Sequence, residues 1–275
     1  MFAINKNCEL CAFENPKPTA TAIIIKDQKL LVAKRNLKGE PFYGRWDFIG
    51  GFLQKDETPQ QALKREIKEE LGVKCSLTYL GAFAGTHYYK KYTFPVVSFA
   101  YLAEIVGKIT LNKKENSKLS WVPLKGLKTI AFDSNQKILK LLKKKFTYDI
   151  SRTKKLVAQL DPTAAVNEQS LYKAMLNGYV SKIERSGKLV GMGWIFPRQT
   201  LLRKQAVIED MIVAEEERGK GWGEKILLDL IGWAKSQGVE VIELTTNPKR
   251  IAANALYQKA GFKLHETNHY LLKLS

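Results

Sequence analysis

The chain contains 275 residues, of which 45% are hydrophobic and 26% are charged. This is an ordinary globular composition, and the length allows two domains of common size. No apolar run approaches the roughly 18 residues that span a bilayer, so we expect no membrane segment and a cytoplasmic protein. The three cysteines cannot make a disulfide framework.

The net charge of +18 comes from 45 Lys and Arg against 27 Asp and Glu, and the basic excess lies mainly in the first half of the chain. A basic chain attracts anionic partners, which include nucleotides, coenzyme A and nucleic acid. A generally basic composition explains the excess equally well. The charge alone therefore selects no partner.

The clearest element of the first half is a helix predicted at 59–71. Thr58 is a candidate N-cap, and Gln61 completes a capping box with it. Pro59 suits the first helical position, and Gly72 can end the helix in the left-handed conformation. Apolar and alternating segments also predict strands, at 19–25, 29–33, 96–105 and 120–123.

A second helix is predicted at 134–146, where leucines and isoleucine alternate with five lysines. Such a basic amphipathic helix could bind a membrane surface or nucleic acid, but a terminal helix that packs on its own domain explains it better. We place the domain boundary just after it, near 147–153.

The second half predicts strands with interleaved helices, which indicates an α/β or α+β domain. The predicted strands lie at 179–184, 189–196, 206–213, 239–245 and 262–272, and the predicted helices at 223–237 and 250–260.

Three glutamates of the helix predicted at 59–71 are the candidate functional residues of the first half of the chain. Glu66, Glu69 and Glu70 are three and four residues apart, so their carboxylates project into one sector of the helix. Crowded carboxylates repel one another unless a cation neutralises them, and oxygen ligands suit Mg2+ or Mn2+. The spacing predicts a divalent metal site, against the alternative of a solvated acidic face.

With Gly51, Glu57, Arg65 and Gly72 at fixed offsets from these glutamates, the stretch 51–73 resembles the Nudix box. The resemblance implies an α/β/α sandwich at 19–148 that hydrolyses a nucleoside diphosphate-linked substrate with Mg2+ or Mn2+. It further implies that Arg65 and Glu57 hold the loop and the helix in register. The metal ligands that it implies are Glu66, Glu69 and Glu70.

The segment 1–18 carries a lone Cys8-x-x-Cys11 pair, similar to the linker after a zinc ribbon in Nudix enzymes of the NADH pyrophosphatase type. A tetrahedral zinc site needs four ligands, and no second pair lies nearby, so we do not expect zinc at Cys8 and Cys11. The Ser-Gln-Pro-Trp signature of the NADH-specific group is absent after the box, so NADH specificity is unsupported.

The nucleotide remains open among ADP-ribose, dinucleotides, sugar nucleotides and capped RNA ends. Charge or stacking makes several side chains candidates for nucleotide contacts, although packing explains each of them alone. These candidates are Arg35, Phe42, Tyr43, Arg45, Trp46, His87, Tyr88 and Tyr89.

In the second half, a glycine-rich loop follows an apolar strand and leads into a helix. Its spacing, Arg218-x-x-Gly221-x-Gly223, fails the dinucleotide and Walker A patterns. It resembles the acyl-CoA pyrophosphate loop of the GNAT N-acetyltransferases, and Tyr257-x-x-x-Gly-Phe262 resembles the end of that family's second cofactor helix. The resemblance implies a GNAT acyl-CoA N-acyltransferase fold at 153–275.

The resemblance implies that acetyl-CoA binds to the loop amides and to the backbone of the preceding strand. It also implies that an unknown amine accepts the acyl group. Tyr257 is then the general acid, and Glu209 or Asp210 accepts the ammonium proton through water. The implied cofactor-binding residues are Met211, Ile212, Val213, Arg218, Gly219, Lys220, Gly221, Trp222, Gly223 and Asn254.

The leading interpretation is a bifunctional enzyme, a Nudix hydrolase fused to an N-acetyltransferase. In one alternative, one domain is a ligand sensor that regulates the other domain. The second domain fits this sensor role better than the first. Another makes the basic first half an RNA-processing module, whose RNA binding should fall steeply with salt. Nucleic acid is not the favoured partner, and a homodimer stays open.

Overall fold

The computed structural model describes residues 15–36, 38–39, 41–89, 92–112, 116–146, 148–163, 166–272 and 274. Cys8, Cys11 and Thr147 lie outside these residues. The described chain divides into two compact units. Unit 1 runs to Ile150 and also includes Asn167–Lys173, whereas unit 2 comprises Ser151–Val166 and the residues from Ala174 onward.

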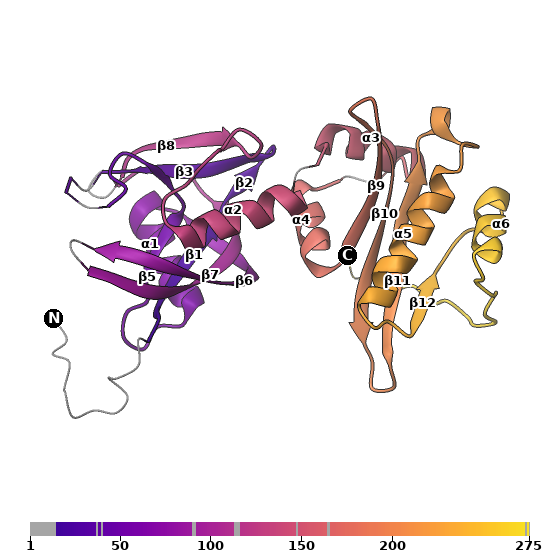
Figure 1. Cartoon of the computed structure of the whole chain (residues 1–275). Coiled ribbons are helices and arrows are strands. Elements are labelled where there is room, and N and C mark those ends of the chain that lie inside the picture. The colour runs from indigo at the N-terminus through magenta and orange to yellow at the C-terminus, as the bar shows by residue number, and fades with distance from the viewer. Residues whose placement is uncertain are drawn as a thin grey trace. The chain divides into compact units, whose positions relative to one another are not determined.

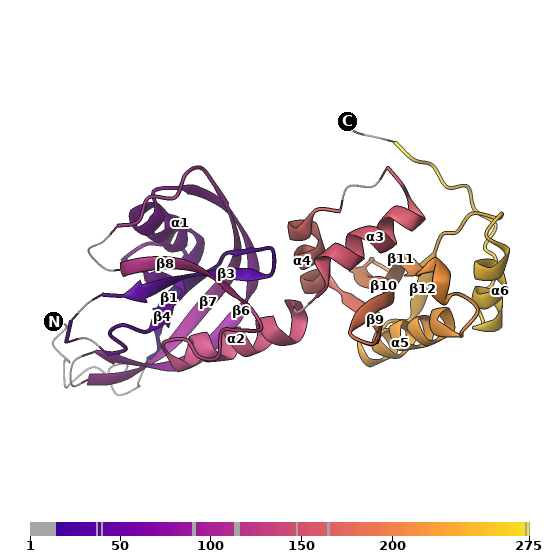
Figure 2. The same ribbon diagram turned by 90° about the horizontal axis from the view of Figure 1, so that it is seen from above.

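Unit 1 is built from strands that lie between two helices, as Figures 1 and 2 show for α1 and α2. Its elements are β1 (Lys17–Ile23), β2 (Ile25–Lys26), β3 (Lys29–Arg35), β4 (Trp46–Asp47), β5 (Ile49–Phe52), α1 (Pro59–Leu71), β6 (Lys74–Tyr89), β7 (Tyr92–Val106), β8 (Asn116–Pro123) and α2 (Asp133–Phe146). One sheet has the order β5-β1-β7-β6, and the other joins β2, β3, β4 and β8. Strand β1 runs parallel to β7 and antiparallel to β5, so the first sheet is mixed.

Helix α1 begins and ends at the residues that its sequence predicts. The Thr58 side chain accepts from the Gln61 amide at 3.3 Å, and the Gln61 side chain accepts from the Thr58 amide at 2.8 Å. Gly72 closes the helix with φ 70°. The apolar side of α1 packs into the core through Leu63, Ile67 and Leu71, which fixes the direction of its glutamates.

A short stretch of α4 (Glu168–Asn177) belongs to unit 1 and caps the β2–β3 hairpin. The Glu168 carboxylate accepts from the backbone amides of Asp27 at 2.7 Å and of Gln28 at 3.1 Å. Tyr172 donates to the same carboxylate and is fully buried beside Phe146, with ring centroids 4.8 Å apart. We call the segment 167–173 the hairpin strap.

Unit 2 is a four-stranded sheet, ordered β12-β11-β10-β9, with helices on both faces. Its elements are α3 (Ile150–Leu160), the end of α4, β9 (Tyr179–Arg185), β10 (Lys188–Gln199), β11 (Lys204–Val213), the short 3-10 helix η2 (Glu215–Glu217), α5 (Trp222–Ser236), β12 (Val241–Leu244) and α6 (Ile251–Lys259). Figure 2 shows α3 and α5 on opposite faces of the sheet. The predicted mixed α/β class is therefore confirmed for both units.

The strand predicted at 262–272 is wrong. These residues take up no regular structure, and Leu264, Tyr270 and Leu271 are at least 77% exposed. A strand needs a hydrogen-bonded neighbour, and this segment has none in the described chain. None of the helices in the described ranges has the length and apolar character needed to cross a membrane.

Candidate functional sites

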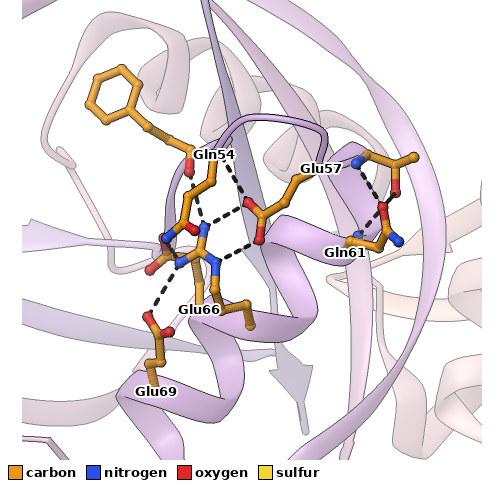
Figure 3. Close-up of polar contacts among 8 residues, drawn as sticks. Gln54, Glu57, Gln61, Glu66 and Glu69 are labelled. Atoms are coloured by element: carbon orange, nitrogen blue, oxygen red, sulfur yellow. Dashed lines mark hydrogen bonds and ion pairs between the residues drawn. The ribbon is translucent and has the colours of Figure 1, made fainter.

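Arg65 forms ion pairs with three carboxylates that α1 and the preceding loop present, and Figure 3 labels these three glutamates, Glu57, Glu66 and Glu69. Its Nε and Nη2 donate to the two oxygens of Glu57 at 2.7 and 3.0 Å. Its Nη1 donates to Glu66 at 2.8 Å and to Glu69 at 3.2 Å. Nη2 also reaches the Phe52 carbonyl at 3.2 Å. One guanidinium thus ties three carboxylates to the end of β5.

This arrangement changes the acidity of Glu57. The hydrogen bonds from Arg65 and from the Gln54 amide hold the pKa of Glu57 at about 2, below its ordinary 4.5. Glu57 is therefore a permanent anion at neutral pH, and its role in the structure is to fix Arg65.

Two of the three predicted ligands flank the backbone of β5. A Cβ atom at Gly51 would lie 2.3 Å from Glu66 Oε1, so a side chain at that position would displace the carboxylate. Glu70 is buried on the inner side of α1, where it accepts from the Gly50 amide at 3.2 Å and from the Asn116 side-chain amide.

The prediction that Glu66, Glu69 and Glu70 together hold a divalent metal stays a prediction, and the three side chains differ in burial. In the described ranges no group of three or more His, Cys, Asp or Glu side chains is arranged to hold a metal ion. Burial explains the difference, since Glu70 faces the interior whereas the Glu69 side chain is 55% exposed.

The donor set nevertheless suits a divalent cation. Glu66 and Glu69 already place carboxylate oxygens on one cationic nitrogen, and hard oxygen donors are those that Mg2+ and Mn2+ prefer. Both carboxylates would hold the metal, with water completing its shell because Mg2+ dehydrates reluctantly.

A cavity of about 360 Å³ opens beside this cluster, and Gly50 and Gly51 form part of its wall. Gly51 therefore lies against the Glu66 carboxylate and also lines the cavity. The other lining residues are Thr19, Ala20, Thr21, Arg35, Asp47, Phe48, Phe52, His87, Tyr88, Val96, Ser98, Phe132, Ser134 and Asn135.

The polar wall of the cavity is centred on the buried Asp47. Arg35 pairs with it at 3.1 Å, and Asn135 donates to it at 2.8 Å. Burial raises the pKa of Asp47 to about 6 in spite of both partners. Asp47 and Asn135 are absent from the predicted site, although a charged residue between Trp46 and Phe48 is a signal that the sequence offers.

Of the aromatic and basic candidates for nucleotide contacts, Arg35, His87 and Tyr88 line the cavity, and Phe42 packs behind it against Phe132 at 4.8 Å. Tyr43, Arg45 and Trp46 are not among the lining residues. The side chain of Tyr89 lies outside the described part of the chain.

In unit 2 the predicted pyrophosphate loop joins β11 to α5. Gly219 and Gly221 have φ 76° and 80°, and a Cβ at either would meet only open space. Lys220 pairs with Glu217 at 3.0 Å, and Arg218 lies 3.8 Å from Glu215. The loop cations are therefore matched by glutamates, and the backbone amides at the start of α5 are the candidate groups for binding an anion.

The predicted acid and base lie on different elements of unit 2. Tyr257, on α6, is buried in the core, and burial raises the pKa of its hydroxyl. Glu209, on β11, is partly buried, and burial together with the neighbouring Asp210 raises its pKa. Asp210 has φ 49°, an irregular position that distorts the strand.

The other predicted cofactor residues have structural contacts. Asn254 donates to the carbonyls of Asn247 and Arg250 at 3.1 and 3.0 Å, so it shapes the turn before α6. Met211, Ile212 and Val213 form the end of β11, and Trp222 begins α5.

A cavity of about 520 Å³ lies in unit 2 at the carboxyl end of β12. It is lined by Leu160, Thr245, Thr246, Asn247, Lys249 and Arg250. The predicted cofactor residues are not among these.

Two family models match the chain, the NUDIX domain at 15–142 and the acetyltransferase (GNAT) family at 137–262. ADP-ribose pyrophosphatase of Methanocaldococcus jannaschii is 31% identical over 127 residues, which are 46% of this chain and 72% of that protein. The chain belongs to the Nudix family and carries a GNAT domain after the Nudix domain. The predicted fusion is confirmed.

Further relatives share shorter stretches. CTP pyrophosphohydrolase of Escherichia coli is 39% identical over 66 residues, 24% of this chain and 46% of that protein. The uncharacterized N-acetyltransferase YobR of Bacillus subtilis is also 39% identical over 66 residues, 24% of this chain and 27% of YobR. The chain thus spans about a quarter of YobR.

Proposed function

We propose that unit 1 hydrolyses the diphosphate of a nucleoside diphosphate-linked substrate with the help of Mg2+ or Mn2+. The observation that carries the proposal is the cluster of Glu57, Glu66 and Glu69 on Arg65, beside a cavity large enough for part of a nucleotide. The relatives that bear the names ADP-ribose pyrophosphatase and CTP pyrophosphohydrolase support this class of substrate.

In the proposed reaction a water oxygen bonds to phosphorus while the bond to the bridging oxygen breaks; the bridging oxygen leaves with the second phosphoryl group, and the water proton passes to solvent. A metal held by Glu66 and Glu69 would polarise a phosphoryl oxygen. Arg65 holds both carboxylates in place, and its bond to the Phe52 carbonyl fixes their distance from the cavity. Placing these groups before the substrate arrives avoids reorganisation during the reaction.

The test uses Glu69→Gln in the full-length protein, with Glu184→Gln as the matched control. Glu184 is an exposed glutamate of β9 that pairs with Lys182. We expect Glu69→Gln to weaken Mn2+ binding by about 10- to 100-fold in calorimetry and to lower metal-dependent hydrolysis, whereas the control retains both. Hydrolysis that persists in EDTA would contradict the proposal.

We further propose that unit 2 binds acetyl-CoA and transfers the acyl group to an amine. The amides of the loop Arg218–Gly223 would hold the pyrophosphate, because positive-φ glycines open the loop at the N-terminal end of the 15-residue helix α5. Glu209, whose pKa is raised by burial and by Asp210, would accept the ammonium proton through water, and Tyr257 would protonate the departing thiolate.

For this unit, Gly221→Glu places a carboxylate where the pyrophosphate would bind. Gly238→Glu is the matched control, because Gly238 has φ 68° and open space around it but lies after the other end of α5. Calorimetry with acetyl-CoA should show at least a ~10-fold weaker affinity for the first variant alone, as expected for one lost charge-assisted contact. Equal affinities of the two variants would refute the loop assignment.

A further inference from the structure

The cavity of unit 2 opens where two parallel strands stop pairing. Strands β11 and β12 run parallel, and their last pair joins Ile208 to Leu244. Glu209, the proposed base, follows Ile208, and Thr245, which lines the cavity of about 520 Å³, follows Leu244. Ligands of open α/β sheets bind beyond the carboxyl ends of the strands. The cavity therefore has the position of a substrate site.

The charged side chains in the wall of this cavity are all positive. Lys249 and Arg250 line it, and both are exposed, so a ligand can reach them. Neither forms an ion pair in the described part of the chain, whereas Arg218 and Lys220 of the predicted pyrophosphate loop lie beside glutamates. The lining contains no aspartate or glutamate. Two cations without a counterion favour an anionic ligand.

Hydrogen bonds hold the turn that carries both cations in one conformation. Oδ1 of Asn247 accepts from the Lys249 amide at 2.9 Å, and the Asn247 carbonyl accepts from the Arg250 amide at 3.0 Å. The Asn254 side chain donates to the carbonyls of Asn247 and Arg250. A site that is ordered before the ligand arrives loses less entropy on binding. Asn247 and Asn254 are thus positioning residues for the two cations.

Arg250 also connects the cavity to the proposed acid. It is the N-cap of α6, and Tyr257 lies about two helical turns further along that helix. Burial raises the pKa of the Tyr257 hydroxyl, and the positive charge of Arg250 lowers this pKa in part. A group bound at Arg250 is therefore close to the hydroxyl that would protonate the thiolate.

We propose that this cavity binds the acceptor of unit 2 through an anionic group, so that the acceptor is an amine that also carries a phosphate or a carboxylate. The proposal rests on the proposed transferase function. The planar guanidinium of Arg250 matches two oxygens of such a group, and Lys249 adds a point charge. A polyamine would instead bring further cations to these two side chains, and juxtaposed like charges reject a ligand.

The anionic group of the acceptor takes no part in the bond changes. The amine nitrogen bonds to the acyl carbon, and the bond from this carbon to sulfur breaks. The proton that the nitrogen loses passes through water to Glu209, and the sulfur takes a proton from Tyr257. Amines with and without the anionic group therefore differ in recognition alone.

O-Phosphoethanolamine, β-alanine and ethanolamine are matched probes, because each carries an amine two carbons from a phosphate ester, a carboxylate or a hydroxyl. NMR titration of the full-length protein should give an affinity at least about 10-fold higher for one of the two anionic probes than for ethanolamine. Acetyl transfer from acetyl-CoA, followed by mass spectrometry, should show the same order, with spermidine as the poorest acceptor. The tighter anionic probe identifies which of the two groups is recognised.

Arg250→Gln and Lys249→Gln test the two cations, since each removes a charge and keeps a polar side chain. Their controls are Arg203→Gln and Lys235→Gln, which remove exposed cations of unit 2 outside the cavity lining. We expect the preference for the anionic probe over ethanolamine to fall to within about 3-fold in Arg250→Gln, because the paired hydrogen bonds are lost. The fall should be smaller in Lys249→Gln, and both controls should keep the wild-type preference.

A wild type that binds neither anionic probe more tightly than ethanolamine would overturn the proposal, as would a preference that survives in both cavity variants. Selective binding without acetyl transfer to the bound amine would show that the cavity is not the acceptor site. Equal transfer to all four amines would remove the acceptor class and leave the transferase function standing. A protein that binds no acetyl-CoA would instead remove the transferase function itself.

Discussion

At the scale of single residues, Arg65 explains why spaced acidic residues form a site instead of repelling one another. Three carboxylates within reach of one guanidinium are mutually tolerable because the cation offsets their repulsion. A metal would add to this neutralisation at Glu66 and Glu69, while Glu57 stays bound to Arg65. The arginine is therefore a positioning residue for the carboxylates.

Glu57 gives this pair a measurable signature at acid pH. Its pKa is lowered to about 2 in the folded state, so its contribution to the free energy of unfolding is complete above about pH 4.5 and is lost as the pH falls toward 2. We expect Glu57→Gln to show a weaker loss of stability over this range than the wild type, in urea unfolding of the full-length protein followed at pH 5, 4 and 3.

Glu184→Gln serves as the comparison, since it leaves the pair of Glu57 and Arg65 intact. Its stability should fall with the wild-type dependence on pH. Parallel curves for wild type and Glu57→Gln would show that the ion pair forms equally in the unfolded chain, and the assigned role of Glu57 would be wrong.

The sequence predicts one side of the hydrolase site better than the other. The glutamates and Arg65 recur at helical spacing, which a linear pattern reveals. The cavity wall joins Asp47 of β4 to Asn135 of α2, residues 88 positions apart, and only the fold brings them together. The inward turn of Glu70 depends likewise on Asn116, which β8 supplies.

At the scale of elements, local signals separate successful predictions from failures. Helix α1 carries both caps in its own sequence, so its predicted limits hold. Strand β6 is absent from the prediction because glycines such as Gly81 break its pattern, and long antiparallel pairing with β7 stabilises it. The segment 262–272 has the pattern of a strand but lacks a neighbour.

The hairpin strap is an element whose effect is measurable. Glu168→Ala removes the acceptor of the Asp27 and Gln28 amides, and hydrogen bonds to a charged group contribute about 1.5–3 kcal/mol where they are shielded from water. Since these bonds are largely exposed, we expect a loss of about 1–2 kcal/mol in unit 1. Hydrogen exchange at Asp27 and Gln28 should quicken.

Glu184→Ala is the matched control, because its exposed pair with Lys182 on β9 contributes at most about 1 kcal/mol. Exchange at the hairpin should be unchanged in it. Unaltered exchange in Glu168→Ala would mean that the β2–β3 hairpin keeps its conformation without the strap.

At the scale of the whole molecule, the chain joins two catalytic families whose model matches overlap at 137–142, inside α2. The basic excess of the first half favours the capture of anionic ligands by long-range attraction, and the proposed diphosphate substrate is such a ligand. This attraction weakens with salt for any anionic ligand, and salt dependence alone does not separate a nucleotide from RNA.

The hairpin strap also bears on how such a chain can be divided or inherited. The polypeptide leaves unit 1 after Ile150, returns to it at Asn167 and leaves again after Lys173. No single cut, and no single recombination breakpoint, yields the complete hydrolase unit free of transferase residues. A hydrolase gene cut after Ile150 would lose the carboxylate that caps its hairpin, whereas one cut after Lys173 would keep it together with residues 151–166 of unit 2.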